Sequence, residues 1–191
     1  MYKFFAYLSR MKNIKRWSLM HSVREENIME HSHQVAVIAH VLALISNKIY
    51  GGDIDVNKVV LTAQYHEVSE VITGDLPTPI KYFNPEIKNA YKDLEKVASN
   101  KLLSMLPENL KDEYEKLILI DTNSKEYKLV KLADRLSAYL KCLEELKLGN
   151  KEFAKAKISI EQDLKNAKSK EVNYFLKEFA PAYALTLDEL D

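Results

Sequence analysis

The sequence is poor in the residues that make tight turns. It has 4 glycines and 5 prolines among 191 residues, whereas these two residues together contribute roughly 12% of an average protein. An all-β protein needs a turn about every 8–12 residues, and glycine and proline are prominent in such turns. The composition therefore argues against an all-β fold and predicts an all-α one.

Cysteine and net charge are also nearly absent. Cys142 is the only cysteine, so the chain cannot form an intramolecular disulfide or a zinc site made of cysteines. Lysine and arginine number 28, and so do aspartate and glutamate. Without an excess of one sign, bulk charge does not hold the protein to nucleic acid or to an anionic membrane. We therefore expect no nucleic-acid polymer and no membrane among its partners.

Long hydrophobic runs are missing as well. The longest apolar stretch, Val35–Ile45, is interrupted by His40 and is too short to span a bilayer. The opening residues, MYKFFAYLSRMKNIKRW, lack the apolar segment of a signal peptide. The sequence shows no internal repeat and no linker rich in glycine, serine or proline. We therefore expect a soluble cytoplasmic protein with a single domain over residues 1–191.

Apolar residues recur at intervals of three and four, which is the helical period. The pattern predicts helices over Met29–Tyr50, Asp55–Ile72, Pro85–Leu106, Lys125–Leu148, Lys151–Ala167 and Glu171–Phe179. In the first of these helices, Val37, Val41 and Leu44 form a second apolar stripe. We therefore expect that helix to be buried on two sides.

Four polar residues occupy helical positions where core residues are expected: His31, His66, Glu67 and Asp134. A buried carboxylate is costly unless another group pairs with it. Two imidazoles and two carboxylates that converge from three helices would suit a divalent zinc, manganese, cobalt or iron ion, with positions left for water and substrate. The residues alone leave another interpretation open, in which both histidines are hydrogen-bonded core residues and Asp134 pairs with Arg135 or with a lysine.

The order of these residues resembles the HD-domain metal-dependent phosphohydrolases: Glu-His-Ser at 30–32, His-Glu at 66–67 and a late aspartate in KLADRLSAYLKCLEE. More narrowly, the chain is similar to the bacterial 5'-deoxynucleotidases over FFAYLSRMKNIKRW, VREENIMEHSHQVAVIAH, YHEVSEVITGDLPTPIKYFN and ADRLSAYLKCLEELKLGN. The resemblance implies a single HD-domain helical bundle. It also implies a cytoplasmic homodimer that hydrolyses deoxyribonucleoside 5'-monophosphates to deoxyribonucleoside and phosphate. The implied cofactor is a divalent metal, with cobalt or manganese first and zinc, iron or magnesium as further candidates.

The resemblance also implies roles for particular residues. The metal ligands are His31, His66, Glu67 and Asp134. Arg16, a catalytic residue, would orient the 5'-phosphate, and Trp17 would pack against the sugar where a 2'-hydroxyl would have to fit. Spacing adds Glu70 as the other catalytic residue, because it follows His66 by four residues and could handle the proton. The expected substrate contacts are Arg16, Trp17, His31, Glu67, Asp75, Leu76, Pro77, Thr78 and Asp134. Without the resemblance, the residues favour a surface arginine beside a core tryptophan for Arg16 and Trp17, and Glu70 is equally a solvated helix carboxylate.

One position departs from the family pattern, because Glu67 stands where the family has aspartate. Glutamate keeps the charge and the oxygens but moves them outward by one methylene, and metal sites are sensitive to such displacements. Two alternatives stay open. Because HD domains host several activities, one is an HD phosphohydrolase that acts on another nucleotide, such as a cyclic nucleotide, a nucleoside triphosphate or an alarmone. The other is a catalytically weakened protein that still binds nucleotides.

Overall fold

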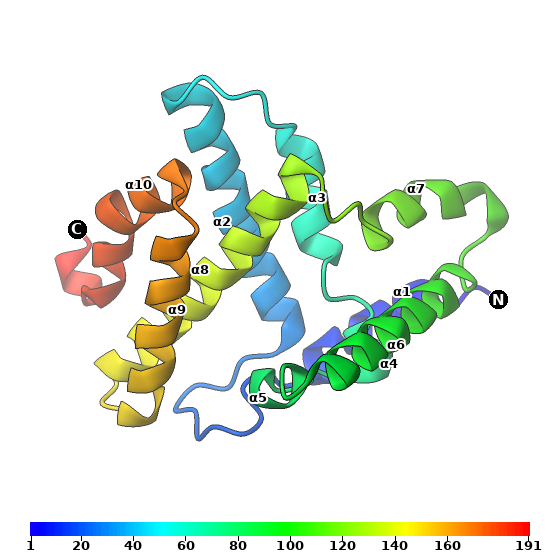
Figure 1. The fold of residues 1–191 in the computed structure, drawn as a ribbon, viewed down its shortest axis with the longest axis horizontal. Coiled ribbons are helices and arrows are strands. Elements are labelled where there is room, and N and C mark those ends of the chain that lie inside the picture. Colours follow the sequence, from blue (N-terminus) through cyan, green and yellow to red (C-terminus); the bar gives the residue numbers. More distant parts are fainter.

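The computed structural model describes residues 1–191, and its regular elements are all helices (Figure 1). The α-helices are α1 (Phe4–Leu8), α2 (Ile28–Ile49), α3 (Val56–Tyr65), α4 (Glu70–Thr73), α5 (Thr78–Lys81), α6 (Pro85–Leu103), α7 (Glu108–Ile118), α8 (Lys125–Lys147), α9 (Ala154–Asn166) and α10 (Lys170–Glu178). Short 3₁₀ helices lie at η1 (Ser9–Asn13), η2 (Lys151–Phe153), η3 (Ala180–Ala184) and η4 (Leu187–Glu189). The predicted all-α fold is confirmed.

The two longest helices, α2 and α8, cross at the centre of the molecule (Figure 1). Helix α3 packs against both of them, α9 packs on α8, and α10 packs on α2. Together they enclose a core of 23 buried residues, with Leu42 of α2 and Leu136 of α8 completely inaccessible. Burial of such a side chain contributes about 1.5–3 kcal/mol. The large core therefore fixes the relative placement of α2, α3 and α8.

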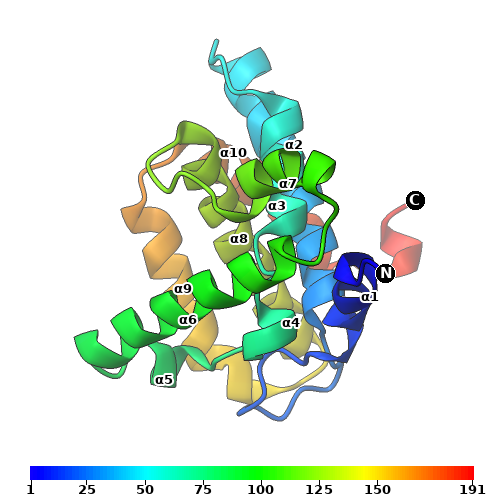
Figure 2. The same ribbon diagram turned by 90° about the vertical axis from the view of Figure 1, so that its right-hand side faces the viewer.

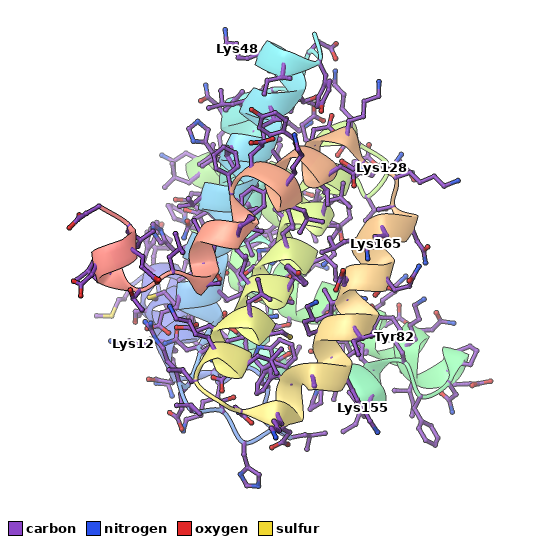
Figure 3. All side chains as sticks on the ribbon, turned by 90° about the vertical axis from the view of Figure 1, so that its left-hand side faces the viewer. Lys12, Lys48, Tyr82, Lys128, Lys155 and Lys165 are labelled. Atoms are coloured by element: carbon purple, nitrogen blue, oxygen red, sulfur yellow. The ribbon has the colours of Figure 1, made fainter.

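A smaller group of buried residues joins the N-terminal segment to α4 and α6, which lie side by side in Figure 2. It consists of Phe4, Met11, Ile28, Val68, Leu102, Leu103 and Leu106. Beyond it, α5 and the start of α6 project from the bundle, and Tyr82 extends outward there (Figure 3). The smaller group therefore holds the segment before α2 next to the turn that follows α3.

Side-chain caps explain where the two central helices begin. The Asn27 side chain accepts hydrogen bonds from the amides of Met29 and Glu30 at the start of α2. Ser124 accepts one from the amide of Tyr127 at the start of α8. These bonds satisfy amides that have no partner within the helix. The predicted helices over Met29–Tyr50 and Lys125–Leu148 are confirmed to within two residues.

The predicted helix over Asp55–Ile72 is wrong in its second half. Helix α3 ends at Tyr65, a turn covers residues 66–69, and α4 begins at Glu70. In the turn, amides bond three residues back, from Glu70 to Glu67 and from Val68 to Tyr65. The His66 ring also bonds to the Ala63 carbonyl, the acceptor that a continuing α-helix would offer to the Glu67 amide. A side chain that competes for a helical acceptor favours the end of the helix.

The second stripe of α2 is also not buried as predicted. Val37 is 56% exposed, and Val41 and Leu44 are only partly covered. Helices α3, α8 and α10 contact α2 elsewhere and leave this face open. By length and composition α2 could cross a membrane, but 56% of its most apolar window is buried in the bundle. A core helix of a soluble protein meets the same criterion.

Helix α7 was not among the predicted helices, because its sequence, ENLKDEYEKLI, is mostly charged. No residue in α7 is fully buried, but Tyr114 and Ile118 pack against the smaller buried group. Charged side chains also project from the other helices, as Lys48, Lys128 and Lys165 do from α2, α8 and α9 (Figure 3). Helix α7 lacks the broad apolar stripe that makes a helix easy to predict. It is stabilised instead by tertiary contacts of a few apolar side chains on one narrow side.

Candidate active site

The four residues predicted as metal ligands lie together inside the bundle. His31 comes from the first turn of α2, His66 and Glu67 from the turn after α3, and Asp134 from the middle of α8. The candidate ligand atoms, one from each residue, all lie within 4.8 Å of one another. His31 Nε2 is 3.1 Å from Asp134 Oδ1 and 3.5 Å from Glu67 Oε1. The crossing of the central helices thus places two imidazoles and two carboxylates around one small space.

The orientation of His66 leaves one ring nitrogen available. Its Nδ1 donates a hydrogen bond to the Ala63 carbonyl at 2.7 Å, so Nε2 carries the lone pair. His66 Nε2 and Glu67 Oε2 are both buried without a hydrogen-bond partner. Buried polar atoms are almost always satisfied, so unpaired atoms need an explanation. Imidazole nitrogen and carboxylate oxygen together suit zinc, cobalt, manganese or iron, and the residues present therefore fit a divalent metal.

His31 is oriented from its other side by groups behind the cluster. Its Nδ1 is 3.2 Å from Ser137 Oγ, and that hydroxyl donates its own proton to Gln34 at 2.6 Å. Ser137 therefore accepts from Nδ1–H, which leaves Nε2 directed at Glu67 and Asp134. A hydrogen bond at the remote nitrogen is the usual way in which proteins fix a metal-binding imidazole.

The charges in the cluster favour a bound cation. Burial opposes a charge on His31, but the carboxylates of Glu67, Asp134 and Glu26 outweigh it and raise the pKa of this imidazole to about 8. Burial also opposes ionisation of Asp134, but Lys131 and His31 lower the pKa of this carboxyl well below its usual value. Without a metal, a proton on His31 thus balances part of the negative charge that the carboxylates supply.

Glu67, the departure from the family pattern, still lies in the cluster. Its Oε1 is 3.5 Å from His31 Nε2 and 3.6 Å from His66 Nε2. Burial opposes its ionisation, but His31 and Arg16 outweigh burial and lower the pKa of the Glu67 carboxyl. The longer side chain extends from a turn rather than from a continuous helix. The Glu67 carboxylate therefore reaches the cluster with its extra methylene.

Arg16 and Trp17 lie between η1 and α2, next to the same cluster. Burial opposes the charge on Arg16, but Glu67, Glu26 and Asp134 outweigh it and raise the pKa of the guanidinium. The Trp17 backbone adopts a φ of 59°, the left-handed region that bulky residues rarely enter. Its indole packs against Phe153 with ring centroids 5.2 Å apart. Of the sequence interpretations, a simple surface arginine is wrong, because Arg16 is mostly buried and faces carboxylates.

Glu70 is buried, so the interpretation of Glu70 as a solvated carboxylate is wrong as well. It is 6% exposed, and its Oε2 has no hydrogen-bond partner. Burial and the charges of Glu67 and Asp75 raise the pKa of the Glu70 carboxyl to about 10. At neutral pH this group therefore holds a proton in the metal-free protein.

The loop after α4 contributes the remaining predicted contacts. Asp75, Leu76 and Pro77 are half-buried, whereas Thr78 is exposed at the start of α5. The Tyr91 hydroxyl donates to the Gly74 carbonyl at 2.9 Å and anchors the loop to α6. Burial and the charge of Glu67 raise the pKa of Asp75 although Arg16 opposes them. The Asp75 carboxyl thus shares the electrostatic field of the cluster.

Two residues next to the site were not singled out by sequence. Lys131 pairs with Asp134 one helical turn away, which realises the lysine pairing that the residues alone left open. Arg135, the other suggested partner, pairs with Asp163 at 2.6 Å instead. Glu26 contacts Trp17, Arg16 and His31 from the loop before α2. Helical spacing could have indicated Lys131, but no periodic signal marks Glu26.

Comparison with known proteins places this chain in a family. The family model described as 5'-deoxynucleotidase YfbR-like matches residues 3–183. A 5'-deoxynucleotidase of Vibrio cholerae is 53% identical over 188 residues, which are 98% of this chain and 97% of that protein. The 5'-deoxynucleotidase YfbR of Escherichia coli is also 53% identical, over 98% of this chain and 94% of its own.

Solved structures share the arrangement of helices. An HD-domain phosphohydrolase from Listeria innocua has a TM-score of 0.82 and 23% identity, and the match covers 95% of this chain and 88% of that one. A cyanophage S-2L HD phosphohydrolase, bound to dA and one catalytic zinc ion, has a TM-score of 0.61 and 20% identity over 94% and 95% of the two chains. By its sequence, this HD-domain helical bundle belongs to the YfbR-like 5'-deoxynucleotidase family.

Proposed function

We propose that this protein is a metal-dependent 5'-deoxynucleotidase, which hydrolyses deoxyribonucleoside 5'-monophosphates to deoxyribonucleoside and phosphate. The observation that carries the proposal is the buried cluster of His31, His66, Glu67 and Asp134, with an imidazole nitrogen and a carboxylate oxygen left unpaired. In addition, the protein is 53% identical, over almost its full length, to proteins named 5'-deoxynucleotidase.

The four residues of this cluster would hold the metal. When bound, a divalent ion would polarise the phosphoryl group and lower the pKa of a coordinated water. Cobalt and manganese are our first candidates, followed by zinc, iron and magnesium. The mixed nitrogen and oxygen ligands suit cobalt, manganese, zinc and iron better than magnesium or calcium, which prefer oxygen ligands.

The chain's own side chains would perform the other steps. The guanidinium of Arg16 would bind oxygens of the 5'-phosphate in a bidentate manner and offset the charge that develops on them. The oxygen of a water molecule would form the new bond to phosphorus. Glu70, whose carboxyl pKa is raised to about 10 in the metal-free protein, would supply a proton to the 5'-oxygen as the ester bond breaks. The indole of Trp17 would lie against the sugar, and residues 75–78 would contact the nucleoside. His31, Glu67 and Asp134 would line the phosphate end of the site.

A panel of nucleotides tests the reaction. Metal-stripped protein is supplied with cobalt, manganese, zinc or magnesium, and phosphate release is measured from deoxy- and ribonucleoside 5'-monophosphates, with Glu67→Asp alongside. We expect release that requires added metal and favours deoxynucleotides. Activity in Glu67→Asp alone would instead indicate a nucleotide-binding protein. Pyrophosphate or triphosphate as the product from other nucleotides would indicate a different HD-domain substrate.

We also propose a cytoplasmic homodimer that folds as a single domain. Exposed apolar side chains support the dimer: Val37 on α2 and, near the C-terminus, Leu187 and Leu190. Glu30 and Gln34 of α2 and Tyr183 of η3 line one depression of about 460 Å³, so these two segments are neighbours. Sedimentation velocity should report a dimer that Val37→Glu weakens, and calorimetry should show one cooperative transition. A monomer at micromolar concentration would contradict the dimer.

A further inference from the structure

Glu26 lies outside the four candidate metal ligands, in the segment that leads into α2. The Arg16 amide donates to the Glu26 carbonyl at 2.9 Å, and the Ile28 amide donates to the Ile14 carbonyl at 3.0 Å. These bonds pair residues 14–16 with residues 26–28 in an antiparallel manner. The pairing brings the Glu26 side chain back over Arg16 and Trp17, where it is only 11% exposed.

One carboxylate therefore touches three parts of the site. Glu26 Oε2 accepts a hydrogen bond from Trp17 Nε1 at 2.9 Å and forms a longer ion pair with Arg16 at 3.5 Å. Its other oxygen, Oε1, lies 3.7 Å from His31 Nδ1. The hydrogen bond to the indole is the shortest of the three contacts. Loss of the Glu26 carboxylate should therefore disturb the position of Trp17 more than that of Arg16 or His31.

Trp17 depends on such support because its backbone is strained. A bulky residue at a φ of 59° persists only where surrounding contacts hold it. Two contacts hold the indole in place: the Phe153 ring, which is tilted by 56° with its centroid 5.2 Å away, and the Glu26 carboxylate at the N–H edge. Ring packing alone permits sliding and tilting, whereas the hydrogen bond fixes the direction of that edge.

We propose that Glu26 is a positioning residue that fixes the Trp17 indole and thereby sets the discrimination between deoxyribonucleotides and ribonucleotides. This inference rests on the proposed function, in which the indole occupies the space that a 2'-hydroxyl would need. Selectivity is a difference between two affinities, and steric exclusion of one hydroxyl requires a wall that does not move. Glu26 makes the wall rigid and does not touch the sugar itself.

Fluorescence tests the positioning without any turnover. Trp17 is the only tryptophan, so tryptophan emission from the metal-free protein reports on this indole alone. We expect Glu26→Ala to change the emission maximum and to increase quenching by acrylamide. Glu26→Gln should stay near the wild type because its amide oxygen can still accept from the indole N–H. Glu25→Ala is the matched control, since Glu25 is 70% exposed and pairs only with exposed Lys15.

Kinetics test the effect on selectivity. The measured quantity is the ratio of kcat/KM for deoxyadenosine and adenosine 5'-monophosphates. We expect Glu26→Ala to lower this ratio about 10-fold, and we expect Glu26→Gln and Glu25→Ala to keep it within about 3-fold. Loss of the Arg16 ion pair affects both substrates and cancels in the ratio. In a Trp17→Phe background, Glu26→Ala should leave the ratio unchanged, because the donor is gone.

The outcomes separate this inference from the proposed function. If Glu26→Ala does not fold, Glu26→Gln and Trp17→Phe still allow the comparison, because Trp17→Phe should lower the ratio and Glu26→Gln should not. If the wild type releases no phosphate, the proposed function fails, and quenching of Trp17 then measures binding of the two nucleotides instead. An unchanged emission and an unchanged ratio in Glu26→Ala would overturn the positioning role. Equal binding of both nucleotides by the wild type would overturn it too.

Discussion

A buried ion pair on α8 holds the segment between η1 and α2 in place. Removal of its carboxylate should lower the free energy of unfolding substantially. Glu145 is fully buried, and its side chain accepts hydrogen bonds from the Val23 and Arg24 amides at 2.8 and 3.1 Å. Lys141 Nζ donates to Glu145 at 2.6 Å, and Asn150 Nδ2 donates at 2.8 Å. Four donors therefore converge on one carboxylate that cannot reach water.

Glu145→Ala would leave the buried charge of Lys141 without its partner. Loss of one member of a buried pair destabilises a protein by about 3–5 kcal/mol. In a domain of this size, each kcal/mol lowers Tm by about 2–4 °C, so we expect a loss of about 6–20 °C. Urea unfolding followed by circular dichroism measures the change in the free energy of unfolding.

A surface pair provides the matched control for this experiment. Glu161 pairs with Lys157 on α9 at 2.6 Å, but both side chains are partly exposed. Glu161→Ala should therefore cost less than about 1 kcal/mol, as surface ion pairs generally do. If Glu145→Ala were no more destabilising than Glu161→Ala, the reasoning from burial would be refuted.

The same carboxylate should contribute to acid unfolding. Burial opposes its ionisation, but hydrogen bonds from Lys141, Asn150 and the Val23 and Arg24 amides outweigh burial and lower the pKa of Glu145 from 4.5 to about 2. A pKa that is lower in the folded state gives stability that is present above the unfolded pKa. This stability is lost as the pH falls from about 4.5 toward about 2. The free energy of unfolding of Glu145→Gln should change less with pH in that range.

Three further predictions concern the start of α2 and the candidate metal site. Asn27→Ala removes the cap of α2 and should cost about 1 kcal/mol of unfolding free energy in urea, whereas Asn27→Ser should restore most of it. Ser137→Ala removes the hydrogen-bond partner of His31 Nδ1 and should weaken metal affinity about 10-fold or more in chelator competition; unchanged affinity would show that Ser137 does not orient this imidazole. Saturation of the stripped protein with metal at 100 times its Kd should stabilise it by about 2.7 kcal/mol in thermal unfolding. His66→Ala should abolish that gain, and an equal gain in this variant would place the metal elsewhere.

The sequence by itself determined the helical class, most helix positions and the four polar residues that meet in the cluster. Helical periodicity records which side of a segment is apolar, so His31 and Asp134 stood out as polar residues on core-facing positions. The family and the unusual Glu67 were also evident from short stretches of sequence. Each of these inferences depends on local spacing or on residue identity. Local spacing and residue identity can both be read without knowledge of the neighbouring helices.

Only the tertiary structure decided which faces are covered and which groups meet. The stripe of Val37, Val41 and Leu44 has the same periodicity as a buried one, but Val37 is 56% exposed and the other two residues are only partly covered. Glu145 and Val23 are 122 positions apart, and no local pattern predicts their hydrogen bond. The role of a buried carboxylate is set by the donors that folding brings to it, and those donors come from distant parts of the chain.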